Sequence, residues 1–167
     1  MKQLIIASAI LTATSMSALA QIPAPSSRSL SEQIIGTWVS TSIGDLYEDG
    51  HIVKSWDPDV RAAVIFDGRG HLIITIIGGS LISPPPPNQN PPVAKRPVVA
   101  SFGTYTVDEA ASTVTTTYER SSEPNLEKVA RTQSMKLNGS DELEQTSAPI
   151  KGPQGTFRPV FGWKRAQ

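Results

Sequence analysis

The residues best placed for chemistry lie on an extended segment at 128–137. Its apolar residues, such as Val129 and Leu137, share one parity, and side chains of one parity face the same side of a β-strand. Arg131 and Gln133 have this parity too, so both are expected to point into an apolar interior. A guanidinium and an amide inside such an enclosure can orient the polar group of a bound molecule.

Strand pairing extends this polar wall to the two preceding segments. A symmetric loop at 121–127 places Thr117 opposite Arg131 and brings Glu119 to the same wall, and a tyrosine joins through the hairpin at 108–112. The cluster could orient a ligand, form a self-satisfied Arg–Glu pair near a barrel mouth, or lie outside after a one-residue shift of register. The predicted ligand-binding residues are Tyr105, Thr117, Glu119, Arg131 and Gln133.

Motifs of the common enzyme classes are absent from the sequence. It contains no G-x-S-x-G elbow, P-loop, dinucleotide fingerprint or EF-hand loop, and no cysteine. His51 and His71 flank turns, and two histidines do not make a standard metal site. We therefore predict no catalytic residue, metal or cofactor. One enzymatic alternative remains, a cofactor-free isomerase or cyclase with Glu119 as acid/base and Arg131 as charge stabiliser.

Short extended segments separated by turns must position these residues. Turn signals such as Asp67-Gly68-Arg69-Gly70 favour antiparallel pairing of sequence neighbours, and a meander of this many strands most easily closes on itself. The expected fold is all-β, an up-and-down antiparallel β-barrel of about eight to nine strands with a short N-terminal helical turn. The candidate strands are 35–47, 51–56, 61–67, 71–77, 98–107, 113–120, 128–137, 142–147 and 156–164.

The first twenty residues have the organisation of a secretory signal peptide. Lys2 supplies a positive charge, an apolar stretch follows, and Ala18-Leu19-Ala20 is an A-x-A-like cleavage site. We expect cleavage after Ala20 and a secreted or periplasmic protein. The expected organisation is a signal peptide at 1–20, a flexible lead-in and helical turn at 21–33, a barrel domain at 34–165, and a proline-rich loop at 83–97 within it.

Several motifs together resemble one protein family. Gly36-Thr37-Trp38, Ile65-Phe66-Asp67-Gly68-Arg69-Gly70 and Phe102-Gly103-Thr104-Tyr105-Thr106-Val107-Asp108-Glu109 occur in the order typical of the bacterial and fungal lipocalin-like domain family, and the resemblance covers nearly all of 34–165. It implies a barrel with an interior cavity, closed at one end by Trp38 beside Gly36. Lipocalins in the wider sense also stack a C-terminal cation over this tryptophan, a role for which Lys164 and Arg165 are the candidates. The structural residues so implied are Gly36, Trp38 and Arg165.

The chain departs from this family where chemistry is concerned. Thr116 and Thr117 stand where the members in question carry a pair of histidines, so an activity that depends on those imidazoles is not implied. The biochemistry of most members is poorly defined, and the resemblance therefore predicts the fold better than the function.

The function predicted from the sequence is binding of a small, largely apolar molecule inside an exported barrel. A cell-envelope interaction module is a further alternative, because Ile73–Ile77 is apolar on both faces and the proline loop could dock a partner. With 15 basic and 15 acidic residues the chain offers no net attraction to nucleic acid. We expect no membrane span, and a monomer or weak homodimer.

Overall fold

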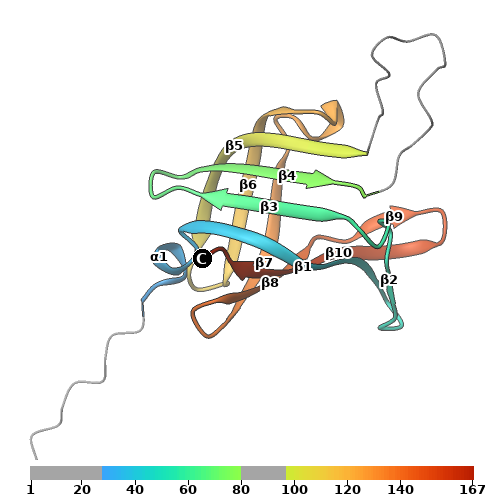
Figure 1. Ribbon diagram of the computed structural model, residues 1–167, viewed down its shortest axis with the longest axis horizontal. Coiled ribbons are helices and arrows are strands. Elements are labelled where there is room, and N and C mark those ends of the chain that lie inside the picture. Colours follow the sequence, from blue (N-terminus) through green and yellow to red (C-terminus); the bar gives the residue numbers. More distant parts are fainter. Residues whose placement is uncertain (1–27, 80–96) are drawn as a thin grey trace, which may run out of the picture.

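Ten antiparallel strands form one sheet that closes into a barrel (Figure 1). The computed structural model describes residues 28–79 and 97–167. The sheet order is β2-β1-β3-β4-β5-β6-β7-β8-β10-β9, and pairing of β1 with β10 closes eight of these strands. The strands are β1 (Gly36–Tyr47), β2 (Ile52–Val53), β3 (Arg61–Phe66), β4 (His71–Ile77), β5 (Val98–Asp108), β6 (Thr113–Ser121), β7 (Ala130–Asn138), β8 (Glu142–Ser147), β9 (Ile150–Gly152) and β10 (Gly155–Arg165).

This architecture confirms the predicted fold class. All nine candidate segments contain a strand, and β9 is the one that the sequence did not suggest. β2 and β9 are short additions to β1 and β10 at the end of the barrel that we call the open end (right in Figure 1). A short helix, α1 (Leu30–Gln33), and the C-terminus lie at the opposite, closed end (Figure 1).

The first strand changes neighbours along its length. Its first four residues, Gly36 to Val39, pair with β3, whereas Asp45 and Leu46 pair with β2. A bulge between Ser40 and Ser42 separates the two halves. Since a bulge bends a strand and increases its twist, β1 leaves β3 here and opens the wall at the open end.

The closed end is built around Trp38. Its ring is fully buried, and its Nε1 donates to the carbonyl oxygen of Ile34 at 2.8 Å. The Arg165 guanidinium lies 4.2 Å from the centre of the Trp38 ring, which is the cation–π contact expected from the sequence. Gly36 has φ +130°, and a Cβ there would lie 2.8 Å from Arg165 Nη1, so the cation needs a glycine beside it.

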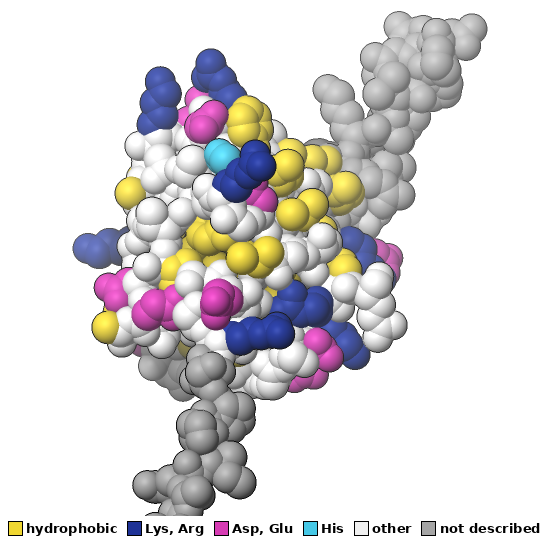
Figure 2. Space-filling view, turned by 90° about the vertical axis from the view of Figure 1, so that its left-hand side faces the viewer, with side chains coloured by type: hydrophobic (Ala, Val, Ile, Leu, Met, Phe, Trp, Pro, Cys, Tyr) yellow, Lys and Arg dark blue, Asp and Glu magenta, His cyan; other side chains and the backbone are white. Residues whose placement is uncertain are grey.

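The helix is fixed to this end by hydrogen bonds at its first turn. Ser29 and Glu32 form the expected capping box. The Glu109 carboxylate, from the β5–β6 turn, accepts hydrogen bonds from the backbone N–H groups of Leu30 at 2.7 Å and Ser31 at 2.8 Å. A negative charge satisfies the free N–H groups of a helix start. In space-filling view, charged side chains of both signs surround hydrophobic ones at this end (Figure 2).

The core consists of side chains from the inner face of every long strand. Alternation is clear in β4, where Leu72, Ile74 and Ile76 are buried while Ile73 and Ile77 are exposed. Apolar residues on both faces of this strand were expected from the sequence. The largest fully buried side chains are Trp38, Trp163, Ile34, Leu143, Val114 and Thr116.

Some predicted segments fall outside the described residues. These are the signal peptide at 1–20, most of the lead-in at 21–33 and the proline-rich loop at 83–97 except Pro97. Pro97 accepts a hydrogen bond from Gly78 N at 2.8 Å, so the ends of β4 and β5 that the segment joins are held together. Within the described ranges, no helix has the length and apolar character needed to cross a bilayer.

Candidate functional site

Five apolar side chains toward the open end form a group that we call the apolar rim. They are partly buried, pack against the core and come from strands on both sides of the barrel and from the loop before β3. A cavity of about 370 Å³ opens here between β1 and the loop before β3, and three of them line it together with polar and charged residues such as Lys54, Asp57 and Arg61. The members of the apolar rim are Ile43, Trp56, Val60, Val99 and Phe161.

Among the apolar core residues the interior also holds several buried polar side chains, one of which, Gln145, pairs with Phe161 of the apolar rim. Thr116 and Tyr118 on β6 and Gln133 on β7 are buried, as is Gln145 on β8. The Nε1 of Trp163 donates to Gln145 Oε1 at 3.0 Å, which satisfies two of these buried groups. Interiors of this kind orient a ligand, because a few polar groups stand among many apolar ones.

Arg131 is the charged member of this interior. It is the second residue of β7, opposite Thr116 on β6 and two residues toward the open end from buried Gln133. Its side chain is half-buried, and its Nε is buried without a hydrogen-bond partner among the described residues. Fewer than one in ten buried polar groups in proteins is left in this state.

The Tyr118 hydroxyl is close enough to Arg131 to respond to its charge. Burial raises the pKa of the Tyr118 phenol, while a hydrogen bond with the Thr116 side chain and the charge of Arg131 lower it. Burial is the largest of these effects, so the phenol stays protonated at neutral pH and can donate a hydrogen bond.

Pairing between β6 and β7 differs by one residue from the prediction. Arg131 lies opposite Thr116, not Thr117, and Tyr105 also lies opposite Thr116. The hairpin between β5 and β6 has four turn residues after Asp108, one more than assumed, with Ser112 at φ +52°. This extra residue accounts for the pairing of Tyr105 with Thr116, whereas the pairing of Arg131 with Thr116 shows that the connection between β6 and β7 is not the symmetric loop assumed. Because side chains alternate, a one-residue shift puts Thr116 on the inner side and Thr117 on the outer side.

Glu119 is also outside, so its predicted place on the inner wall is wrong. Phe102 pairs with Arg120 and Gly103 with Tyr118, which leaves Glu119 as the extra residue of a β-bulge. Both Glu119 and Arg120 are exposed as a result. The enzymatic alternative loses its acid/base group, and no Arg131–Glu119 ion pair exists.

On β7 the predicted inner face is correct from Arg131 onward. Gln133 and Met135 are buried and Leu137 is partly buried. Val129 was assigned to the same face but is 45% exposed. The reason is local: Lys128 has φ +59°, so β7 begins only at Ala130 and Val129 does not continue the alternation.

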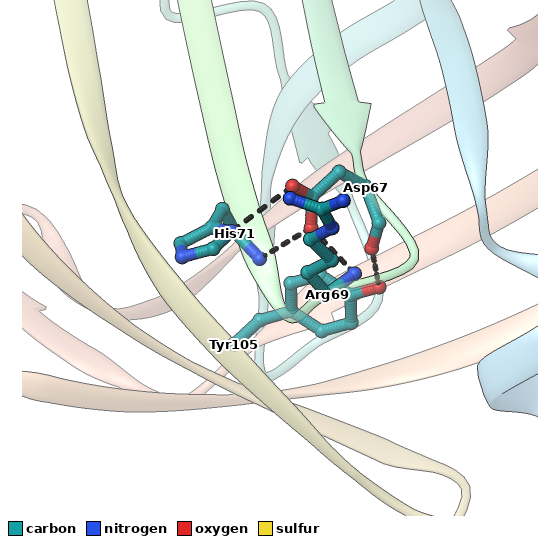
Figure 3. A network of polar contacts seen from close by, with 4 residues as sticks. All are labelled: Asp67, Arg69, His71 and Tyr105. Carbon is teal, nitrogen blue, oxygen red and sulfur yellow. Dashed lines mark hydrogen bonds and ion pairs between the residues drawn. The ribbon is translucent and has the colours of Figure 1, made fainter.

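Tyr105 points inward as predicted, but its hydroxyl is engaged at the closed end. It donates to the carbonyl oxygen of Asp67 at 2.6 Å, and its ring packs edge-on against Phe66 with 5.0 Å between centroids. Figure 3 shows this tyrosine against the β3–β4 turn. We therefore do not retain Tyr105 as a ligand contact.

His71 is held by hydrogen bonds of the same β3–β4 turn. The Asp67 carboxylate accepts hydrogen bonds from the backbone N–H groups of Arg69 and His71, both at 2.8 Å, and its Oδ2 lies 3.0 Å from His71 Nδ1 (Figure 3). The backbone hydrogen bond from His71 is the main reason that the pKa of Asp67 is lowered to about 2. His51 stacks on Tyr47 at 4.6 Å beside another turn. No group of three His, Asp or Glu residues in the described part of the chain could hold a metal ion.

The sequence contained a signal for the residues that were missed. Thr116 and Tyr118 share the parity of apolar Val114, and Gln145 shares that of Leu143. Apolar parity within β6 therefore identifies the inner face, whereas the assumed loop symmetry gave the wrong one.

Comparisons with known proteins find similar folds and no close relative. No protein-family model and no curated protein matches the chain. Solved structures that are similar include a redesigned β-barrel, with 15% identity and a TM-score of 0.41 over 82% of this chain and 94% of the other. Bovine odorant binding protein in complex with a selenium-containing odorant has 12% identity and a TM-score of 0.42, over 86% of this chain and 77% of the other. These likenesses are too remote to identify a ligand, and membership of the lipocalin-like domain family stays a prediction.

Proposed function

We propose that this chain binds a small, largely apolar molecule through the open end of its barrel. The apolar body of the ligand would lie against the apolar rim, in contact with residues such as Ile43, Val60 and Val99. Its polar group would reach the interior beneath, where Tyr118, Arg131 and Gln133 lie.

The observation that carries this proposal is the juxtaposition of the apolar rim and the polar interior. Partly exposed apolar groups at a cavity gain free energy when a ligand covers them, at about 25 cal/mol per Å² of buried apolar surface. A buried polar atom without a partner gains a hydrogen bond in the same event. Both features lie on the inner face, and both are incomplete in the chain alone.

We further propose that the protein is exported and that cleavage follows Ala20, as the organisation of residues 1–20 suggests. N-terminal sequencing of protein from the envelope or culture fluid should begin at Gln21. Recovery of intact Met1–Ala20 on a membrane-bound product would contradict export by cleavage.

Neighbouring valines at the start of β5 allow a matched test of the binding site. Val99 belongs to the apolar rim, whereas Val98 is 42% exposed on the outer wall. The neutral probe N-phenyl-1-naphthylamine should bind the wild-type barrel saturably with increased fluorescence. Val99→Lys should weaken it about tenfold or more, since a charge at the site must be desolvated. Val98→Lys should leave it unchanged.

The opposite pattern would identify a different function. The outer wall carries Ile65, Ile73 and Phe102 opposite one another on β3, β4 and β5. If the probe is lost on Val98→Lys or Phe102→Lys but kept on Val99→Lys, the outer wall binds apolar partners and the interior does not. Val99→Trp fills the site without adding a charge. If this variant also loses the probe, the loss reflects a blocked site and not a fold destabilised by a buried lysine.

A further inference from the structure

The state of Arg131 indicates what kind of polar group the ligand carries. A guanidinium stays protonated in any protein environment, so burial cannot neutralise it as it can a lysine. Half-burial of Arg131 and loss of all hydrogen bonding at Nε therefore leave a permanent charge that is incompletely solvated. Water can solvate only the exposed part of this charge, and an anion bound from outside the chain would complete its pairing.

No counterion for Arg131 exists among residues 28–79 and 97–167. None of the ion pairs within this part of the chain includes Arg131. The buried polar residues are Ser101, Thr116, Gln133 and Gln145, all of them neutral. Glu119, the carboxylate expected from the sequence, lies outside on its bulge.

The groups near Arg131 are donors that complement a negative charge. Tyr118 is buried and presents a protonated hydroxyl, and it lies on β6 two residues along the inner face from Thr116, the residue that pairs with Arg131 on β7. Gln133 follows Arg131 on the same inner face and offers an amide N–H₂. A planar guanidinium with a hydroxyl beside it suits a group with two equivalent oxygens, because each oxygen can accept its own hydrogen bond.

We propose that the ligand is an amphiphile with a carboxylate head, held by Arg131 together with Tyr118, and an apolar body that contacts the apolar rim. This inference rests on the proposed function, since it names the chemical class of the molecule bound at that site. Arg131 is the second residue of β7, which begins at the open end, so the carboxylate lies just below the apolar rim and enters first. A ligand in this orientation supplies the missing counterion and covers the rim in one binding step.

A pair of probes that differ only in the head group tests the inference without any mutation. We would measure dissociation constants for 11-(dansylamino)undecanoic acid and for its methyl ester at neutral pH, from dansyl fluorescence. The acid should bind about tenfold or more tightly than the ester, the scale of a hydrogen bond to a charged group. Equal affinities would overturn the carboxylate inference while leaving the proposed function intact. Binding of neither probe would contradict both.

Two arginines on neighbouring strands supply the matched variants. Arg131→Met should weaken the acid about 10- to 100-fold and change the ester less than about twofold, because only the charged head loses its partner. Arg120→Met removes the same charge from the outer side, where Arg120 is exposed and pairs with Glu127. It should change neither affinity. An equal loss on Arg120→Met would show general charge attraction and overturn the site.

Tyr118→Phe tests the second contact with little change of volume. The acid should bind about three- to tenfold more weakly and the ester unchanged, since one hydrogen bond to the carboxylate is removed. If Arg131→Met fails to fold, the ratio of acid affinity to ester affinity, compared between Tyr118→Phe and wild-type protein, still tests whether the carboxylate binds at this site. A ratio that neither Tyr118→Phe nor Arg131→Met lowers would place the carboxylate elsewhere.

Discussion

Two arginines face the interior of this barrel in opposite states of satisfaction. Arg165, on β10, donates hydrogen bonds to three backbone carbonyl oxygens. Its Nε donates to Ser140 at 3.0 Å, its Nη1 to Ile35 at 2.9 Å and its Nη2 to Gln33 at 2.6 Å. Its guanidinium also makes the cation–π contact with the Trp38 ring. In contrast, Arg131, on β7, has a buried Nε that donates a hydrogen bond to no described residue.

The difference separates a structural cation from one that awaits a partner. At the closed end every group needed by Arg165 is supplied by the chain itself, and the carbonyls that it binds come from two segments, the end of α1 and the β7–β8 turn. At Arg131 the surrounding groups are neutral or donors. Removal of Arg165 should therefore cost stability and spare binding, and removal of Arg131 should do the reverse.

The largest effect is expected at the floor of the closed end. Trp38→Ala should lower the free energy of unfolding by about 3–5 kcal/mol, because it removes the largest side chain of the core and leaves a cavity. Urea unfolding followed by circular dichroism measures this. A loss below about 1 kcal/mol, the range of surface substitutions, would mean that Trp38 does not hold the closed end together.

Arg165→Met should destabilise the barrel by about 2–3 kcal/mol, since three carbonyls lose a charged donor and Trp38 loses its cation. Lys164→Met, on the outer side of the same strand, is the control and should change stability by less than about 0.5 kcal/mol. Binding of the dansyl acid to the folded fraction of Arg165→Met should be normal. Loss of binding in folded Arg165→Met would show that Arg165 also contributes to the binding site, contrary to the structural role assigned to it.

Arg131→Met should raise the unfolding free energy of the ligand-free protein by about 1 kcal/mol, because it replaces an uncompensated charge by an apolar side chain of similar length. The dansyl acid should then stabilise wild-type protein and have far less effect on this variant. Destabilisation by more than about 1 kcal/mol would show that Arg131 has a structural role like that of Arg165.

The smallest effect concerns pH and the β3–β4 turn. Asp67 has a pKa of about 2 in the folded chain against an ordinary value of 3.8, so its ionised form favours folding above pH 4. That contribution is lost as pH falls from 4 toward 2. Asp67→Asn should therefore have a lower melting temperature than wild type at pH 7, and the gap should close by pH 2. A gap independent of pH would rule out the carboxylate as its cause.

Much of the fold could be predicted because the relevant signals are local. Strand positions follow from alternation and turn residues, and the capping box at Ser29–Glu32 is recognisable from spacing alone. The inner face of β7 was also predictable, because Met135 and Leu137 share the parity of Arg131. Each of these inferences needs only residues that are close in sequence.

The candidate site was predicted in part, because pairing between strands depends on loop geometry. One additional residue in the turn before Thr113, and one at the bulge of Glu119, set how β6 pairs with β5, and an asymmetric connection between β6 and β7 brings Thr116 opposite Arg131. Both depend on backbone conformations, such as the positive φ of Ser112, that non-glycine residues rarely adopt and that sequence patterns do not predict. The apolar rim was missed because its members come from strands and a loop far apart in the sequence.

The pairing of β1 with β10 has a consequence for self-association. An unpaired strand edge exposes rows of N–H and C=O groups that another chain can extend into an aggregate. Here the strands at the two ends of the sheet order are β2, of two residues, and β9, of three, which are too short to template a stable cross-chain sheet. Strands as apolar as β4 are therefore sheltered from edge-to-edge growth, even though the chain contains no disulfide to hold the barrel shut.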